Sequence, residues 1–358
     1  MSVAILGIES TCDETAAAVV VDGWDVRSNV VASQVELHAK YRGVVPEIAS
    51  RAHIGNILPV LKDAAFTPAP GTLGESRGEG LPSSGMFDAI AVAHRPGLVG
   101  SLLIGVTAAK TLAWALGKPL IGVDHVHAHL YSVVLERNEQ PPMPATGLVV
   151  SGGHTALYRV GNWLDVELIG STIDDAVGEA YDKVAALLGL GYPGGPILDK
   201  LAEKGDPKAV EFPRTLLGRD SLDFSFSGLK TAVLYHVHGV PTRERKIDTS
   251  KPPPLSDQRL ADVAASFQAA CVDVITTKLK RAVRRTRARS VIVGGGVSAN
   301  RGLRAALAKF PVPVYFPPLR YCTDNAAMSA GLASVYFAER KFSALDLDAI
   351  THSQFRDA

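Results

Sequence analysis

The stretch ILGIESTCDETAAAVVVDGWDVRSNVVAS (residues 5–33) decides the fold of this chain. It reads as an apolar strand, a polar turn, a second apolar strand, a glycine turn followed by tryptophan, and a third strand. The same order of features returns at residues 147–171, as GLVVSGGHTALYRVGNWLDVELIGS, with little identity. The pattern predicts two similar β-β-β units, although two unrelated antiparallel meanders would produce it too.

Strand and helix patterns alternate over the rest of the chain, which is typical of α/β proteins. Apolar runs predict strands at residues 3–8, 16–21, 26–32, 87–93, 120–123, 147–150, 156–160, 165–169, 290–293 and 312–316. Helical patterns cover residues 46–65, 98–117, 125–137, 174–189, 226–235, 260–287, 300–309 and 324–339. Two β-β-β units, each followed by helices, predict a two-lobe actin-like ATPase fold, which is a duplicated ribonuclease H-like architecture with a central cleft.

The same pattern predicts how the chain is divided. We expect residues 1–123 to form an N-terminal lobe and residues 124–323 a second lobe, with a helix at about residues 324–340 packing back on the first. Residues 67–86 contain five Gly, three Pro and three Ser, so they predict a flexible loop. Residues 241–256 combine Pro-Pro-Pro with four basic residues and predict an exposed basic loop.

Composition excludes several classes of protein. The 358 residues carry 37 Lys+Arg against 36 Asp+Glu, so bulk positive charge cannot hold nucleic acid or an acidic membrane. Hydrophobic residues make up 47%, which allows a large core and excludes disorder as the main state. Three cysteines without a C-x-x-C pattern indicate a reducing compartment. With no signal peptide or membrane span visible, the sequence predicts a cytoplasmic enzyme.

Three turns have the chemistry of a nucleotide site. The first, ESTCDET (residues 9–15), offers hydroxyls and backbone N–H groups for phosphate, and the carboxylates of Glu9, Asp13 and Glu14 for a metal-bound water or a reacting amine. The second, VVSGGHT (149–155), lets a ligand approach its backbone, and the third, VIVGGGVSAN (291–300), leads from a strand into a helix. The alternatives are plain hairpin turns and, for Asn300, a helix cap.

A metal site is predicted by the segment DHVHAH (residues 124–129). His125 and His129 are four residues apart, so on a helix both imidazoles lie on one face and reach one cation. His127 points elsewhere and is expected at the surface. Asp324, an acid at a predicted helix start, is the candidate third ligand, and two His with one carboxylate suit Fe(II) or zinc. A surface coincidence of two histidines is the alternative.

Three further segments carry candidate binding residues. Asp182, in DDAVGEAYDK (174–183), has the chemistry to bind ribose hydroxyls, or it belongs to a charged first helical turn. Gly195 and Asp199 follow in a tight turn and the helix after it. Residues 278–289 hold seven Lys/Arg, which predict a solvated helix end or a contact to RNA phosphates.

Together these motifs resemble those of the bacterial tRNA N6-adenosine threonylcarbamoyltransferase (TsaD) family, formerly called O-sialoglycoprotein endopeptidases. The matching strings are GIESTCDET, SQVELHAKYRGVVPEIASRAH, PGLVGSLLIG, HVHAH, VSGGHT, DDAVGEAYDK, GYPGGP, LDFSFSGLKTAV, GGGVSANRGLR and YCTDNAAM. They run in order over most of the chain, from about residue 3 to residue 337.

The resemblance implies a reaction and a set of roles. Such an enzyme transfers the threonylcarbamoyl group from L-threonylcarbamoyl-adenylate to N6 of adenosine 37 in tRNAs that read codons beginning with A, and AMP leaves. His125, His129 and Asp324 would bind one Fe(2+), and Asp13 or Glu14 would be the catalytic base. The residues that would bind the adenylate are Val149, Val150, Ser151, Gly152, Gly153, Asp182, Gly195, Asp199 and Asn300.

The resemblance also implies partners, and it is not complete. A metal-free TsaB-like paralogue and a small TsaE-like ATPase are expected to work with such a protein, and the helices at 46–65 and 98–117 are candidate contact faces. The family pattern has glycine where Arg95 stands before Pro96. An ATP-binding regulatory protein or a small-molecule kinase of the same fold is the alternative function. The endopeptidase label lacks support, because the chain has no H-E-x-x-H.

Overall fold

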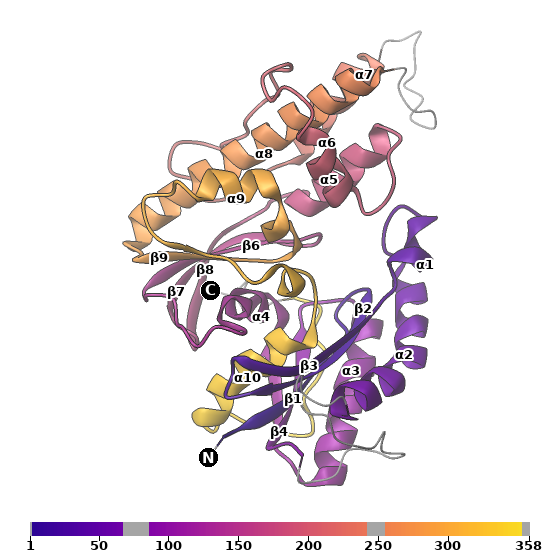
Figure 1. Ribbon diagram of the computed structural model, residues 1–358, viewed down its shortest axis with the longest axis vertical. Coiled ribbons are helices and arrows are strands. Elements are labelled where there is room, and N and C mark those ends of the chain that lie inside the picture. Colours follow the sequence, from indigo (N-terminus) through magenta and orange to yellow (C-terminus); the bar gives the residue numbers. More distant parts are fainter. Residues whose placement is uncertain (1, 67–85, 242–254, 353–358) are drawn as a thin grey trace.

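The computed structural model describes residues 2–66, 86–241 and 255–352, and Figure 1 shows two sheet-containing halves stacked along its long axis. The predicted loops at 67–86 and 241–256 lie almost entirely outside the described residues. The first sheet has the order β3-β2-β1-β4-β5. Its strands are β1 (Ala4–Glu9), β2 (Glu14–Val21), β3 (Asp25–Ser33), β4 (Ala89–Arg95) and β5 (Leu120–Asp124).

The second sheet repeats this topology. Its order is β10-β9-β6-β7-β8, with strands β6 (Ala145–Val150), β7 (Thr155–Asn162), β8 (Asp165–Ser171), β9 (Ser290–Gly294) and β10 (Val314–Tyr315). In each sheet three consecutive strands pair antiparallel, and two later strands add in parallel beside the first of them. The predicted duplication and the actin-like fold are therefore confirmed, and the alternative of unrelated meanders is wrong.

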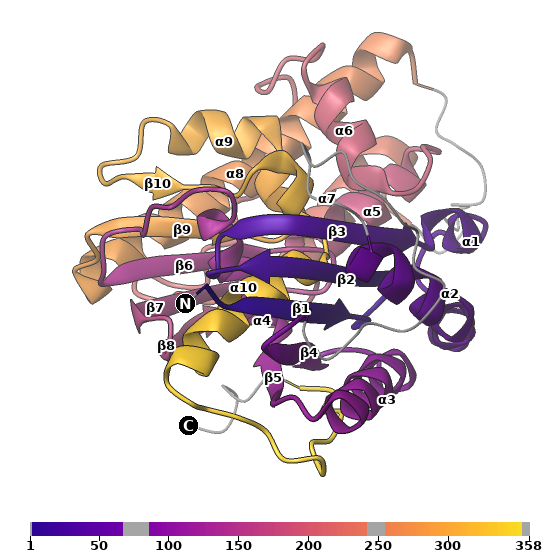
Figure 2. The same ribbon diagram turned by 60° about the horizontal axis from the view of Figure 1, so that its bottom comes forward.

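Alternation along the strands explains how helices cover both faces of the first sheet. Ile5 of β1 packs in a core with α10 (Ala326–Ala338), whereas Leu6 and Ile8 pack with α2 (Pro46–Phe66) and α3 (Val99–Leu116). The short helix α1 (Val35–Ala39) precedes α2 and had no counterpart among the predicted helices. Since α10 follows the second sheet in sequence but packs on the first, the chain returns to its first half near its end (Figure 2).

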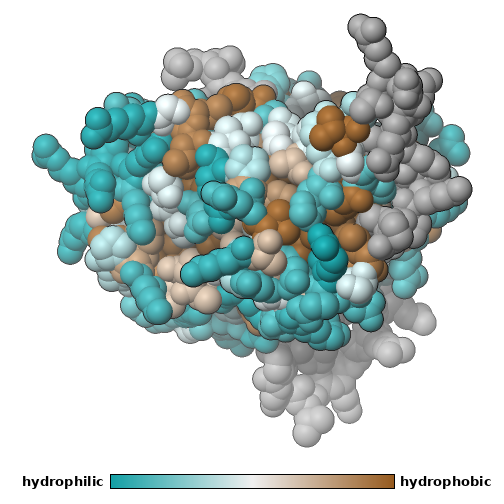
Figure 3. Space-filling model, turned by 90° about the horizontal axis from the view of Figure 1, so that it is seen from above, coloured by the Kyte–Doolittle hydropathy of each residue, from teal (hydrophilic) through white to brown (hydrophobic). Residues whose placement is uncertain are grey.

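The second sheet is covered by the helices of its own half. A single apolar core joins its strands to these helices, and Phe224, Phe226 and Phe267 are the largest fully buried side chains in it. The helices are α5 (Val177–Leu187), α6 (Gly194–Ala202), α7 (Ser227–His238), α8 (Asp257–Thr286) and α9 (Arg301–Leu307). Seen from the α7–α8 end, hydrophilic side chains divide the apolar ones into several small areas (Figure 3).

Helix α4 (His125–Tyr131) lies between the two sheets and contacts β6, β9 and α10 (Figure 1). Asp124 caps it, because its side chain accepts hydrogen bonds from the N–H groups of Val126 and His127. The helix was predicted to run to residue 137, but it gives way to a 3-10 turn at Ser132–Val134. The hydroxyl of Ser132 donates to the carbonyl of His129, and such a bond competes with the helical pattern.

Two helices are long and apolar enough to cross a membrane by length and composition alone. In α3, 39% of the apolar window is buried, and in α8, 61%. Both pack against other elements of the fold, α3 on β4 and α2, and α8 on α6 and α9. Length and composition are therefore weak evidence for a membrane span in either helix.

The segment after α10 runs along the outer edge of the first sheet. Ser343 donates its N–H to the carbonyl of Leu120 in β5, with which it forms an isolated antiparallel bridge. Farther on, the N–H of Ile350 donates to the carbonyl of His94, and Nδ1 of His94 donates to the carbonyl of Asp348. The segment thereby covers β5, which is an edge strand.

Candidate functional site

The predicted metal ligands converge between the two halves. The ligand atoms of His125, His129 and Asp324 all lie within 4.8 Å of one another. Nε2 of His129 lies 3.1 Å from Oδ1 of Asp324, and Nε2 of His125 lies 3.6 Å from the same oxygen. The alternative of a surface coincidence is wrong, because both histidines are buried.

The chemistry of these three side chains fits a cation. Two imidazole nitrogens and one carboxylate oxygen are a donor set for Fe(II) or zinc that leaves coordination positions open. Neither ring nitrogen of His129 makes a well-directed hydrogen bond with another described residue, as expected of a ligand. The group can therefore hold a metal ion.

Electrostatics tie the ligands together. Burial alone would lower the pKa of His125, but the carboxylates of Glu9 and Asp324 raise it to about 9. Burial would raise the pKa of Asp324, but the nearby imidazoles of His125 and His129 hold it below its ordinary value. Without metal the site is thus a buried ion-pair cluster. A bound cation would supply the positive charge that the proton on His125 otherwise provides beside the carboxylates.

Two helices, α2 and α3, support the acidic turn between β1 and β2. His53 of α2 approaches the carbonyl of Cys12 through Nε2 at 3.0 Å and the hydroxyl of Thr15 through Nδ1 at 2.8 Å. The hydroxyl of Ser101 in α3 donates to the same Cys12 carbonyl. These contacts present Asp13 and Glu14 on a rigid turn, a support that the sequence reasoning missed.

Glu14 of this turn is a carboxyl with a perturbed proton equilibrium. Burial raises its pKa well above the ordinary value, and the nearby charges of Asp324 and Asp13 raise it further. Asp13 is 9% exposed, so it is nearly enclosed as well. Glu14 is partly buried and near enough to Asp324 to feel its charge, so these two neighbouring carboxyls suit proton transfer.

The second turn lies close to the metal ligands and to α5. Its hairpin is closed by the N–H of Ser151, which donates to the carbonyl of His154, and the N–H of Gly178 donates to the carbonyl of Ser151. Nothing stands within 4 Å of where a side chain would begin on Gly152 or Gly153. The backbone of these two glycines is therefore open to a ligand.

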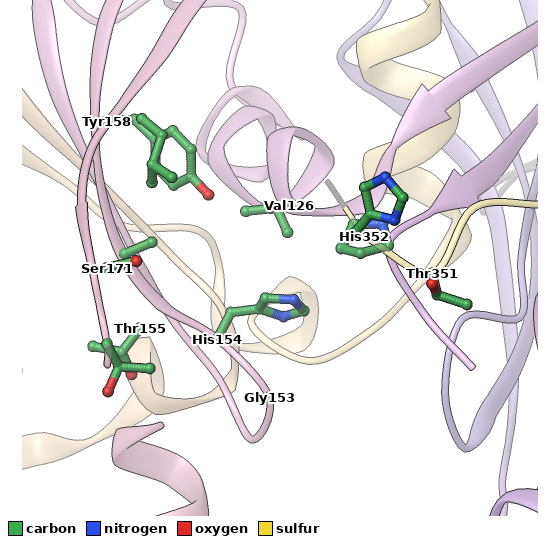
Figure 4. A pocket seen from close by; sticks show the side chains of 12 residues that line it. Val126, Gly153, His154, Thr155, Tyr158, Ser171, Thr351 and His352 are labelled. Atoms are coloured by element: carbon green, nitrogen blue, oxygen red, sulfur yellow. The ribbon is translucent and has the colours of Figure 1, made fainter. Parts of the chain in front are cut away.

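His154 projects from this turn into a cavity of about 170 Å³ (Figure 4). Its ring centre lies 6.5 Å from that of His125. Burial and the charges of His125 and His129 lower the pKa of His154 to about 4, so its imidazole is neutral near pH 7. Thr351 and His352 line the other side of the cavity.

The third turn packs directly against the second turn and against helix α4. Gly295 has a φ of +89°, and a Cβ there would lie 2.4 Å from the carbonyl oxygen of Val150 in the second turn. A Cβ on Gly294 would lie 2.3 Å from the carbonyl oxygen of His129. Asn300 caps α9 by accepting from the N–H of Leu303, so the capping role is confirmed.

The remaining predicted substrate residues have structural partners in the second half. Oδ1 of Asp182 accepts from the N–H of Gly194 at 2.7 Å, and burial raises the pKa of this carboxyl despite the N–H groups of Gly194 and Gly195. Asp199 accepts from the side chain of Arg301 at 2.9 Å. These contacts link α5 to α6 and α6 to α9.

Two expectations from the sequence are wrong. His127 is buried at 7% exposure beside Tyr158, because the helix that carries it lies between the two sheets. Lys278, the first residue of the basic cluster, is fully buried and donates to the carbonyls of Leu216 and Ser221. The solvated part of the cluster consists of Lys280, Arg284, Arg285, Arg287 and Arg289.

Arg95, which stands where the family pattern has glycine, lies next to helix α4, which carries His125 and His129. Its Nε lies 3.5 Å from Oδ2 of Asp124, the residue that caps α4. The extra positive charge thus meets a buried carboxylate, at the end of β4 and beside the first ligand.

The fold and the site define a class. Two sheets of one topology, three turns meeting between them and a metal-ligand group describe a two-lobe nucleotide-binding protein of the actin-like ATPase fold. Solved structures of that fold share it at low identity. HypF from T. kodakarensis matches with a TM-score of 0.58 and 16% identity over 96% of this chain and 49% of its own. The Acidaminococcus fermentans (R)-2-hydroxyglutaryl-CoA dehydratase component A matches with a TM-score of 0.51 and 13% identity over 94% of this chain and 99% of its own.

Sequence comparisons are more specific. The family model described as tRNA N6-adenosine threonylcarbamoyltransferase (TsaD) matches residues 25–331. Relatives of that name are 50% identical in Moorella thermoacetica, over 97% of this chain and 95% of theirs, and 49% identical in Thermomicrobium roseum, over 97% and 96%. The chain belongs to the tRNA N6-adenosine threonylcarbamoyltransferase family, and it is a tRNA-modifying transferase.

Proposed function

We propose that the protein transfers the threonylcarbamoyl group of L-threonylcarbamoyl-adenylate to N6 of adenosine 37 in tRNAs that read codons beginning with A. In this reaction N6 bonds to the carbamoyl carbon, the bond from that carbon to the phosphate oxygen breaks, and AMP leaves with the electron pair. The observation that carries the proposal is the metal-ligand group of His125, His129 and Asp324 beside the open glycine backbone of the second turn.

The residues divide the work between binding and proton transfer. We assign the adenylate to the turn Val149–Gly153 with Asp182, Gly195, Asp199 and Asn300, where open backbone and carboxylates suit phosphate and ribose. An aromatic amine is a poor nucleophile, so orientation by these groups contributes much of the rate. Asp13 or Glu14 accepts the proton that N6 loses, since both stand on the rigid turn near the metal group.

The metal proposed for the site is one Fe(2+), with zinc as the alternative ion. When bound, it supplies positive charge that stabilises the leaving phosphate and polarises the reacting group. Metal analysis of protein purified without oxygen tests the identity of the ion. One iron per chain is expected, and a stoichiometric zinc content with full activity would replace iron in the proposal.

The proposal also includes partner proteins and a cellular location. A TsaB-like paralogue docks on the outer face of α2 and α3, where Ile54, Leu58, Val99 and Leu103 are exposed. A TsaE-like ATPase completes the system, and the protein works in the cytoplasm. Because the net charge is only +1, we propose that tRNA is bound by the local cluster of Lys and Arg at the end of α8 and by partner subunits. We also propose a lobe boundary near residue 124.

One assay tests the transfer. Purified protein, the adenylate donor, the two companion proteins and unmodified tRNA are incubated, and digested tRNA is analysed by mass spectrometry for the modified nucleoside. Companions shown to be active with a related transferase serve as the control. If no modified nucleoside forms while the control forms it, the proposed reaction is wrong.

A further inference from the structure

Glu9 is a fully buried carboxylate at the end of β1 that belongs neither to the predicted metal ligands nor to the predicted catalytic pair. Its Oε1 accepts from the N–H of Thr11 at 2.9 Å. Its Oε2 lies 3.2 Å from Nδ1 of His125 and 3.3 Å from the hydroxyl of Ser329 in α10. A buried carboxylate is costly unless donors surround it, and three groups that can donate do so here.

The contact with Glu9 favours a hydrogen on Nδ1 of His125, and the hydroxyl of Thr11, 3.2 Å from the same nitrogen, can accept from it as well. Oε2 of an ionised carboxylate can only accept, so Nδ1 carries the hydrogen of the bond. In a neutral imidazole Nε2 is then the atom with the free lone pair. It is also the atom that lies 3.6 Å from Asp324, so the tautomer set by Glu9 aims the lone pair at the other two ligands.

Glu9 also joins the segments that supply the ligands. His125 is the first residue of α4, and Ser329 belongs to the helix that begins two residues after Asp324. Both meet one carboxylate on β1, although they lie 116 and 320 residues away from it in sequence. A single side chain thereby fixes the ring of one ligand and the helix next to another.

We propose that Glu9 is a positioning residue of the metal site, which holds His125 as the Nδ1–H tautomer and orients its Nε2 toward the ion. The inference rests on the metal role proposed for His125, His129 and Asp324. Carboxylates that orient ligating histidines in this way typically contribute about 10–100-fold to metal affinity.

The experiment measures metal binding without tRNA, so it is independent of the transfer assay. Zn²⁺ affinity is determined by competition with a chromogenic chelator for the full-length protein, the Glu9→Gln variant and an Asp88→Asn control. Asp88 accepts from the N–H of Ala4 at the opposite end of β1, so it supports the same strand away from the ligands. Glu9→Gln should weaken Zn²⁺ binding about 10–100-fold, and Asp88→Asn should leave it unchanged.

A second measurement needs no variant at Glu9. Long-range ¹H–¹⁵N NMR of the zinc-loaded wild-type protein, with the His125 signals assigned by loss in His125→Gln, should show a protonated Nδ1 and a metal-bound Nε2. The proposal is overturned if the proton sits on Nε2, if Glu9→Gln binds Zn²⁺ like wild type, or if both carboxyl variants weaken binding equally. Failure of the wild-type protein to bind Zn²⁺ or Fe²⁺ would overturn the metal site and this role together.

Discussion

The substitution Gly294→Ala tests whether the third glycine turn supports helix α4, which carries the candidate ligands His125 and His129. A Cβ at this position would lie 2.3 Å from the carbonyl oxygen and 3.2 Å from the Cβ of His129. Ordinary contact begins near 3.4 Å, so β9 and α4 must separate by about 1 Å in a closely packed interior. Overpacking of this kind costs about 1–3 kcal/mol of unfolding free energy.

The same displacement acts on the metal site. Nε2 of His129 lies 3.1 Å from Oδ1 of Asp324. If α4 shifts by about 1 Å, the two atoms no longer have the geometry that lets one metal ion bind both. We expect an apparent melting temperature lower by about 2–4 °C per kcal/mol lost, and Zn²⁺ affinity reduced about tenfold or more. Differential scanning fluorimetry and chelator competition measure the two effects.

A neighbour in the same turn provides the matched control. A Cβ on Gly296 would meet only Cγ2 of Thr323, at 3.9 Å, so Gly296→Ala adds the same methyl group without overlap. If Gly294→Ala melts and binds Zn²⁺ like Gly296→Ala, the close approach between β9 and α4 does not position the ligand, and the reasoning fails.

Three further predictions concern single side chains. His129→Ala should abolish stoichiometric metal binding as measured by elemental analysis, whereas His127→Ala should retain it, since only His129 belongs to the ligand group. Lys278→Met should lower the unfolding free energy in urea by about 1–3 kcal/mol without changing tRNA affinity, because the carbonyls of Leu216 and Ser221 lose their hydrogen bonds to a charged group and keep only Arg281 as a donor; an unchanged urea midpoint would contradict this. Charge reversal of the exposed Arg284 and Arg285 should weaken tRNA binding and flatten its salt dependence in filter-binding assays, and an unaltered salt slope would place the RNA elsewhere.

Much of the fold was predictable because its signals are local. Apolar runs and glycine turns mark β1–β3 and β6–β8, and pairing within each unit follows from short connections, so the duplication is visible without the structure. Helix α4 ended early because a serine hydroxyl competes for a backbone carbonyl, a detail that hydrophobic periodicity does not record. The five-residue α1 is too short to leave a periodic signal.

The site was predictable in part, and the missing part is tertiary. The i, i+4 spacing of His125 and His129 is local, so it indicates a ligand pair directly. Glu9 touches partners more than one hundred residues away, and no spacing rule connects them. Lys278 belongs to a run of charged residues, which indicates exposure. In the fold, however, its ammonium group is buried and donates to the carbonyls of Leu216 and Ser221, about 60 residues earlier in the chain.

The segment that runs beside β5 has a consequence for self-association. An uncovered edge strand offers free N–H and C=O groups to any other strand, and edges of this kind promote aggregation. Here the backbone of Ser343 forms a hydrogen bond with Leu120 of β5, so the segment after α10 covers this edge of the sheet. Removing residues 342–358 would expose an apolar strand, and a truncated protein should precipitate even where its metal site is intact.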